Sequence, residues 1–438
     1  MAEKTLIKGG TVLSLDPGVG NFSKADVLYE GTKILEVGQE ISANGVKEID
    51  ASQMIVMPGF VDTHRHMWQG ILRNAGTRFL STNPAHRNGN QRQINNRFRP
   101  ADVFASTLSS ALGATDAGIT TIVNYSDIGL SHEHVQADLD AMQKSGMRGL
   151  FAIGVDSGQG AGEARLSDLR TFIETSFAGS VNLIGPALAS AGPEFESIES
   201  LKREWAAARE MGLRIATQVG MSGQGRAEGI AQAAKANLLG PDVLFAHCNT
   251  LSEANLRLIK DHEVEVSLAP AAEMMLGYGQ PTIQRMLDLD IQPSLGIDSE
   301  GVSRGDLFTQ MRAAISMQHA LSFEKKLARH ISPNRITTRD VLEYVTVAGA
   351  RAVGMADRIG TLTPGKEADI VLLRQFSINV MPVNDPIGAV VWAMDTSNVD
   401  TVIVSGRTLK RNGELVDADL AHLRKITSEA RDHIFAAS

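Results

Sequence analysis

Short apolar runs alternate with amphipathic segments across the middle of the chain, from residue 59 to residue 360. Eight of these runs have the length of strands, and they cover residues 59–66, 118–126, 148–156, 181–189, 213–220, 243–249, 264–270 and 291–299. The segments between them repeat apolar residues at helical spacing, as in "ESLKREWAAAREMG". Eight alternations of strand and helix predict a mixed α/β fold with a (β/α)8 TIM barrel. A doubly wound open sheet is the alternative, but no GxGxxG motif follows the first run to favour it.

The two ends of the chain show a different pattern, with short alternating strands separated by glycine turns. Such stretches are "KTLIKGGTVLSLD", "ADVLYEGTKILEVG" and "KEIDASQMIVMPG" near the N-terminus, and "GTLTPGKEADIVLLR" and "VDTVIVSGRTLKRNGELV" near the C-terminus. We therefore expect a small β-sandwich domain formed from both termini, residues 1–58 and 361–438. The catalytic barrel is expected to occupy residues 59–360.

The composition of the chain limits the kinds of molecule that the protein is expected to bind. The net charge of −8 and the lack of a basic cluster argue against nucleic acid or a membrane surface, and favour a small-molecule substrate. The single cysteine, Cys248, excludes an intrachain disulfide and a multi-cysteine zinc site. Neither a signal peptide nor a run of 18 apolar residues is visible, so we expect a cytoplasmic protein.

Polar residues close four of the predicted barrel strands. His64 and His66 end the first strand, and residues i and i+2 of a strand face the same side about 7 Å apart, so both imidazoles can point into the barrel mouth. Gln218, His247 and Asp298 end later strands. Taken singly, His247 could be a buried core histidine and Asp298 a helix cap. Together they are typical of a functional rim at the carboxyl ends of barrel strands.

The chain resembles the amidohydrolase superfamily, in its cytosine deaminase-like and chlorohydrolase-like branch. The motifs that carry the resemblance run in order along nearly the whole chain: "PGFVDTHRHMWQ", "GITTIVNYSD", "FAHCNTLSE", "PSLGIDSEG" with "GDLFTQMR", and "GTLTPGKEADIVLL". The resemblance implies a distorted barrel beside a β-sandwich. It also implies a homo-oligomer, because enzymes of this family often form dimers or larger assemblies.

The resemblance also implies a metal centre. In that family one divalent metal, commonly zinc or iron, with manganese or cobalt as alternatives, lowers the pKa of a bound water. Carried over, His64 and His66 match the first ligand pair, Asp298 matches the ligand and base, and His247 matches the histidine that contacts the substrate or a developing oxyanion.

Strand five departs from the family pattern, because Gln218 stands where a histidine ligand is expected. An amide is a much poorer zinc ligand than an imidazole. Three hypotheses follow: Gln218 completes a weaker site, another group such as His86 in the long loop of residues 77–100 replaces it, or the metal is lost.

A second departure concerns the proton shuttle. Deaminases of this branch carry a glutamate shortly after the strand-five histidine, and "QVGMSGQGRAE" has none before Glu228. Glu273 or Glu300 could supply a carboxyl group instead, although a surface or capping role is the simpler interpretation of each. Trp68 and Tyr278 are candidates for an aromatic wall beside a planar substrate, with ordinary packing as the alternative.

The sequence therefore predicts a metal-dependent hydrolase that cleaves a non-peptide C–N bond of a small cyclic or heteroaromatic compound. The first alternative is an amide, carbamate or urea hydrolase, or a dechlorinase, of the same superfamily, since a better leaving group needs less protonation. The second is a metal-free pseudoenzyme or binding protein, which Gln218 favours because it replaces an expected histidine ligand.

Overall fold

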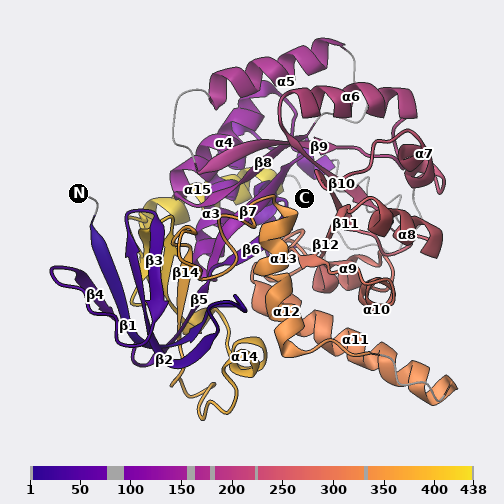
Figure 1. Cartoon of the computed structure of the whole chain (residues 1–438). Coiled ribbons are helices and arrows are strands. Elements are labelled where there is room, and N and C mark those ends of the chain that lie inside the picture. The colour runs from indigo at the N-terminus through magenta and orange to yellow at the C-terminus, as the bar shows by residue number, and fades with distance from the viewer. Residues whose placement is uncertain are drawn as a thin grey trace. The chain divides into compact units, whose positions relative to one another are not determined.

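The structure is a computed structural model, and it describes residues 3–75, 93–154, 163–177, 183–221, 225–329 and 334–436 (Figure 1). The contacts divide the chain into two compact units. The first consists of Met1–Asp62, Leu112–Ile122 and Asp306–Ala418, and the second of Thr63–Ala111, Val123–Gly305 and Asp419–Ser438. The predicted domain boundaries at residues 58 and 361 stay a prediction.

A sheet of eight strands follows the chain in sequence order, from β6 to β13. Its strands lie inside the predicted apolar runs, except that β9 ends one residue beyond its run: β6 (Phe60–Arg65), β7 (Ile119–Ser126), β8 (Arg148–Gly154), β9 (Ile184–Ser190), β10 (Arg214–Val219), β11 (Val243–His247), β12 (Glu265–Leu268) and β13 (Ser294–Leu295). The pairs from β8 to β13 are parallel. A parallel bridge between Arg65 and Asp298 joins the first strand to the end of the last, so the sheet is nearly closed into a barrel. The predicted fold class is confirmed.

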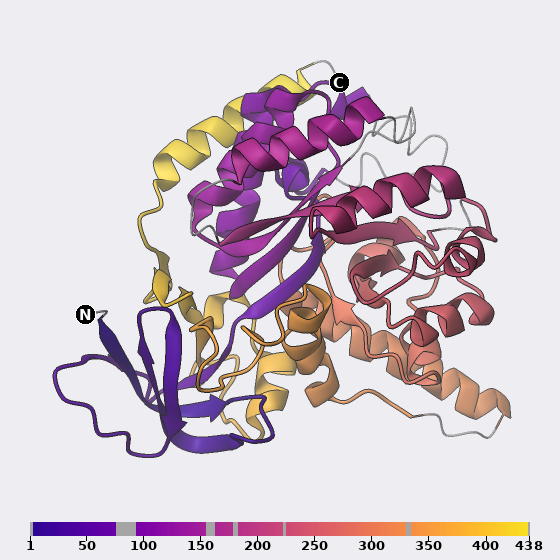
Figure 2. The ribbon, with the colours of Figure 1, turned by 45° about the horizontal axis from the view of Figure 1, so that its top comes forward.

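Helices connect the barrel strands, and in the second unit α4 to α8 lie around the outside of the strands (Figure 2). Serine residues cap the N-termini of α6 and α8. The side chain of Ser197 accepts a hydrogen bond from the Ser200 amide, and that of Ser252 accepts one from the Asn255 amide. The connecting elements between β6 and β13 are η1 (Met67–Leu72), α3 (Pro100–Asp116), α4 (His132–Ser145), α5 (Glu163–Ser176), α6 (Ile198–Glu210), α7 (Gly229–Lys235), α8 (Glu253–Asp261), α9 (Pro270–Leu276) and α10 (Ile283–Leu287).

A separate sheet combines strands from both ends of the chain, as expected. Its order is β17-β16-β15-β14-β5-β1-β2-β3, with β4 paired to β1. Antiparallel pairing of β5 with β14 joins the two ends, with Val56 opposite Leu372. The strands are β1 (Lys4–Leu13), β2 (Asn21–Glu30), β3 (Lys33–Gly38), β4 (Lys47–Asp50), β5 (Met54–Pro58), β14 (Ile370–Arg374), β15 (Val399–Val404), β16 (Arg407–Arg411) and β17 (Glu414–Leu415). A buried cluster that includes Val27, Ile34 and Ile403 forms the core of this sheet.

The remaining elements follow the barrel strands in sequence. They are α11 (Leu307–Arg329), α12 (Thr338–Tyr344), α13 (Val347–Ala352), α14 (Pro386–Gly388), η2 (Ala389–Ala393), η3 (Thr396–Asn398) and α15 (Leu420–Phe435). Within the described parts of the chain, no helix has the length and apolar character needed to cross a membrane.

Candidate metal centre and active site

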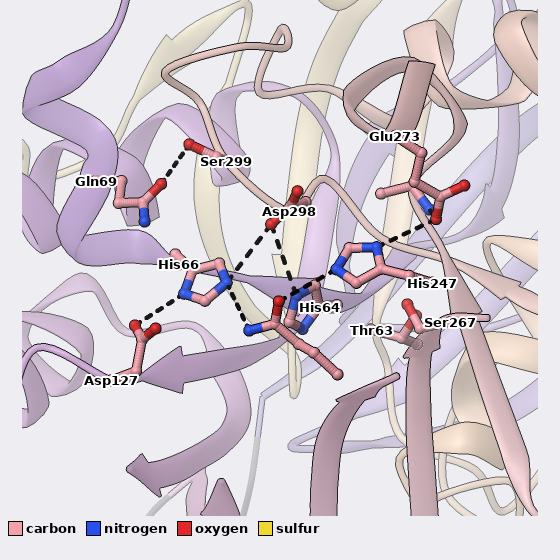
Figure 3. A network of polar contacts seen from close by, with 12 residues as sticks. Thr63, His64, His66, Gln69, Asp127, His247, Ser267, Glu273, Asp298 and Ser299 are labelled. Carbon is pink, nitrogen blue, oxygen red and sulfur yellow. Dashed lines mark hydrogen bonds and ion pairs between the residues drawn. The ribbon is translucent and has the colours of Figure 1, made fainter. Parts of the chain in front are cut away.

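Five polar side chains gather at the carboxyl ends of β6, β10, β11 and β13, and Figure 3 labels four of them, His64, His66, His247 and Asp298. His64 lies in β6 and His66 follows it, Gln218 lies in β10 and His247 in β11, and Asp298 follows β13. Gln218 is half-buried and the other four are buried. The parallel barrel thus brings together all the strand-end residues that the sequence singled out.

His64 at the end of β6 and His66 just after it both point their Nε2 atoms at one oxygen of Asp298. The distance from Asp298 Oδ1 is 3.7 Å to His64 Nε2 and 3.5 Å to His66 Nε2. Ligand atoms around a tetrahedral zinc ion, with bonds of about 2.1 Å, lie roughly 3.4 Å apart. One ligand atom from each of His64, His247 and Asp298 lies within 4.8 Å of the other two, so among the described residues these three form a candidate metal-binding group, which does not include His66.

The backbone of the barrel seam sets these positions. The Asp298 amide donates to His64 O at 2.8 Å, and the His66 amide donates to Asp298 O at 2.9 Å. A Cβ added to Gly296 would lie 2.8 Å from the backbone nitrogen of His64, so only glycine allows this approach. Asp298 and His247 have φ angles of 64° and 78°, in the left-handed region that costs a non-glycine residue free energy. Such strain is typical of functional positions.

The electrostatics of the group favour a bound cation. Burial, together with the neighbouring His66 and His247, lowers the pKa of His64 well below its ordinary value, so its imidazole is neutral. Burial also raises the pKa of Asp298. Among the described residues, no hydrogen-bond donor reaches Asp298 Oδ2. Two imidazole nitrogens and a buried carboxylate with an unsatisfied oxygen are a donor set that fits a divalent metal.

Asp127 is a site residue that the sequence reasoning missed. It follows β7, and its Oδ1 accepts hydrogen bonds from His66 Nδ1 at 2.9 Å and Trp68 Nε1 at 2.6 Å. Burial alone lowers the pKa of His66, but the Asp127 carboxylate raises it to about 9. With its Nδ1 hydrogen directed at Asp127, His66 presents Nε2 to the centre of the site. The signal was available, since "GITTIVNYSD" is an apolar strand run that ends in an aspartate.

Gln218 lies between the two imidazoles of His66 and His247. Its Nε2 is 3.4 Å from His66 Nε2, and its Oε1 is 3.3 Å from His247 Nε2. The side chain at the strand-five position therefore reaches the centre of the group. Its role as a ligand stays a prediction.

Glu273 holds His247 from the opposite side. Its Oε1 lies 3.3 Å from His247 Nδ1 and accepts a 2.8 Å hydrogen bond from the Ala269 amide, while Asn249 Nδ2 donates to Oε2. Glu273 is fully buried, and the half-buried Tyr278 places its ring edge to face with His247, with centroids 5.1 Å apart. Both residues thus lie beside His247, and contact of either with substrate stays a prediction.

Three other residues were predicted to bind substrate: Glu300, Trp68 and His86. Glu300 is fully buried and paired with Arg65 at 2.9 Å and with Arg73. Trp68 is 1% exposed and packs against Phe98 in addition to its bond to Asp127. His86 lies outside the described residues. Substrate binding by these residues remains a prediction.

A cavity of about 730 Å³ opens beside the candidate metal ligands His64, His66 and Asp298. Its polar lining includes Asp127, Gln218, Asn95 and Asn96. The rest of the lining is largely apolar or small: Tyr125, Ile128, Gly129, Leu130, Gly154, Ala189, Ala191, Phe195 and Met221. The cavity shares Asp127 and Gln218 with the contacts described above, and its size suits a small organic molecule.

A barrel with one histidine at the end of its first strand, a second directly after it and an aspartate after its last strand matches the metal-dependent hydrolase that the resemblance implied. The chain belongs to the amidohydrolase family, whose model matches residues 55–409. The predicted resemblance is thereby confirmed. As predicted, the protein is a metal-dependent hydrolase of this family that acts on C–N bonds other than peptide bonds.

Curated relatives match the chain over nearly its full length. A 5-methylthioadenosine/S-adenosylhomocysteine deaminase of Pelotomaculum thermopropionicum is 27% identical, with 97% of each chain covered. A 5'-deoxyadenosine deaminase of Methanosarcina acetivorans is 26% identical over 97% of this chain and 96% of the relative.

Solved structures share the fold. An adenosine deaminase from Xanthomonas campestris with bound zinc superimposes with a TM-score of 0.85 at 19% identity, covering 99% of each chain. The atrazine chlorohydrolase of Arthrobacter aurescens complexed with zinc gives a TM-score of 0.86 at 20% identity, covering 98% of this chain and 100% of that one.

Proposed function

We propose that this protein is a deaminase that replaces an amino group on a small N-heteroaromatic ring with the hydroxyl of water, releasing ammonia. The observation that carries the proposal is the approach of His64 Nε2 and His66 Nε2 to one oxygen of Asp298, at 3.7 and 3.5 Å. The near full-length similarity to deaminases of adenine nucleosides supports an aminated ring as the substrate.

His64, His66 and Asp298 would hold one divalent ion, zinc or iron, and Gln218 would complete the set. When bound, such an ion supplies Lewis-acid chemistry and lowers the pKa of a water molecule towards 7. Asp298 is the proposed base, because its Oδ2 accepts no hydrogen bond from the described residues and burial raises its pKa, which favours proton uptake.

His247 is the proposed contact for the developing negative charge at the attacked carbon. Its imidazole is oriented by Glu273, which accepts from the Nδ1 side and leaves Nε2 directed at the site. With Nδ1 donating to Glu273, Nε2 can donate a hydrogen bond to that charge when the ring carries a hydrogen on both nitrogens, and the held orientation avoids reorganisation during the reaction.

A second candidate is hydrolysis of a better leaving group, such as chloride or a substituted amine. The segment after β10 has no glutamate before Glu228, so the usual donor of a proton to the ring and leaving amine is missing from that position. The fold similarity to the atrazine chlorohydrolase is compatible with this alternative.

The test is ammonia release across a panel of 5'-deoxyadenosine, 5'-methylthioadenosine, pterins, aminopyrimidines, chlorotriazines and arylureas. The protein is purified without chelators, its metal content is measured by plasma mass spectrometry, and it is reconstituted with zinc, iron, manganese or cobalt. We expect bound metal and ammonia release from at least one aminated ring. Turnover of chlorotriazines or ureas alone would replace the proposal with the second candidate, and failure to retain any metal would overturn both.

We also infer that the protein acts in the cytoplasm, and that it forms a homo-oligomer, as its family resemblance implies. Light scattering coupled to size-exclusion chromatography tests the second point, because a monomer of 47.0 kDa would contradict it.

A further inference from the structure

Only one oxygen of the Asp127 carboxylate accepts hydrogen bonds from the described residues. Both described donors, His66 Nδ1 and Trp68 Nε1, lie on Oδ1. Figure 3 shows the bond to His66 ending on one oxygen of this carboxylate, while the other oxygen is joined to none of the residues drawn. A carboxylate has room for about four hydrogen bonds over two oxygens, so Oδ2 keeps its accepting capacity.

Asp127 also differs from its partners in exposure. Its side chain is 38% exposed, whereas that of His66 is 6% exposed. Asp127 lines the cavity of about 730 Å³ together with Gln218, Asn95 and Asn96. Leu130 and Phe195, which are 46% and 48% exposed, line the same cavity and offer apolar surface to a ring.

The hydrogen bonds to Asp127 leave an acceptor at the cavity. His66 Nδ1 and Trp68 Nε1 both donate to Oδ1. The cavity is lined by the same carboxylate, and a ligand that buried it without offering a donor would leave an acceptor unsatisfied at a cost in binding free energy.

We propose that Asp127 has two functions: Oδ1 positions His66, and Oδ2 accepts a hydrogen bond from an N–H group of the substrate. The preferred substrates are then aromatic rings that carry at least one free N–H or amino group. Fully N-alkylated rings are rejected. This inference rests on the proposed deaminase function, whose site it describes in more detail.

Asp127→Asn separates the two functions. The amide oxygen of asparagine can still accept from His66 and Trp68, while its NH2 replaces Oδ2 and turns the acceptor in the cavity into a donor. Asp127→Ala removes both functions. Asp140→Asn, the same chemical change at an exposed position on α4, is the matched control.

Binding is measured by calorimetry on the zinc-loaded protein with two pairs of probes. These are melamine with hexamethylmelamine, and adenosine with N6,N6-dimethyladenosine; the members of each pair share a ring and differ in amino N–H donors. We expect the unmodified protein and Asp140→Asn to prefer an N–H member by about tenfold or more, since a hydrogen bond to a charged group has that effect. In Asp127→Asn the preference should fall below about threefold.

Zinc content measured on the same samples reports the positioning function. We expect Asp127→Asn to retain zinc and Asp127→Ala to bind it at least about tenfold more weakly. Equal binding within both pairs by the unmodified protein, no binding of either N–H member, or a preference that survives Asp127→Asn would each overturn the proposal. Because the probes are scored by binding, a protein that binds them selectively but releases no ammonia would contradict the deaminase function alone.

Discussion

Arg65 donates a 2.9 Å hydrogen bond to Glu300, and both side chains are fully buried. Arg65 ends β6 and stands between His64 and His66 in the sequence, and Glu300 lies two residues beyond Asp298. The ion pair therefore ties together the two chain segments that carry the candidate metal ligands. Ser110 Oγ donates to the same carboxylate oxygen at 2.5 Å, and Arg73 pairs with the other oxygen.

Glu300→Gln should lower the free energy of unfolding by about 3 kcal/mol, because it leaves Arg65 buried without a counter-charge. Arg65→Met should cost less, since Arg73 still pairs with Glu300. Urea unfolding followed by circular dichroism measures both. Glu210→Gln, at an exposed ion pair with Arg170, is the control and should change stability by less than about 0.5 kcal/mol. An equal, small effect of all three substitutions would contradict the assignment of a structural role to this pair.

Gln218→His should tighten zinc binding by at least about tenfold, because an imidazole replaces an amide that lies 3.4 Å from His66 Nε2 and 3.3 Å from His247 Nε2. Competition with a chromogenic chelator gives the dissociation constants. Gln232→His, on the exposed face of α7, controls for adding a histidine elsewhere. If Gln218→His binds zinc no better than the unmodified protein, the strand-five position is not a ligand position.

Asp138→Asn should stabilise the protein near pH 8 and have little effect near pH 3. Asp138 Oδ1 accepts from Thr107 and Asn124, but within the described residues no donor reaches Oδ2, and burial raises the pKa of this carboxyl above 3.8. The protonated form is favoured in the folded state. Its stabilising contribution is therefore complete below pH 3.8 and is lost as the pH rises through the folded-state pKa.

Urea unfolding of Asp138→Asn and of the unmodified protein at several pH values measures this difference. The stability gap should widen with rising pH and then level off. A variant that is less stable than the unmodified protein at pH 8 would show that the Asp138 charge is compensated in the folded state.

Cys248 should resist alkylation in the folded protein. Its side chain is fully buried, and burial together with Glu273 and Glu194 raises the pKa of the thiol well above its ordinary value, so the reactive thiolate is scarce. Intact-mass spectrometry after iodoacetamide at pH 8 should find no adduct on the folded protein and one adduct after unfolding in guanidinium. Rapid labelling without denaturant would contradict the burial of this residue.

Local patterns were sufficient to predict the residues at the strand ends. Strand geometry directs His64 and His66 to the same face, and the carboxyl ends of parallel strands bring His247 and Asp298 to that face. The same alternation turns Arg65 away from them, but its partner Glu300 is distant in sequence, and no local pattern reveals that pairing. Asp127 was not predicted as a site residue, because its contact with His66 depends on the packing of β7 beside β6.

The backbone contacts of His64 with Asp298 have a consequence for assembly. They join the beginning of the barrel sequence to the residues that follow β13. A metal held by these same residues would bridge two distant points of the chain, and its binding free energy would oppose the entropy of closing that long loop. Such an ion would therefore stabilise the closed barrel as well as supply chemistry.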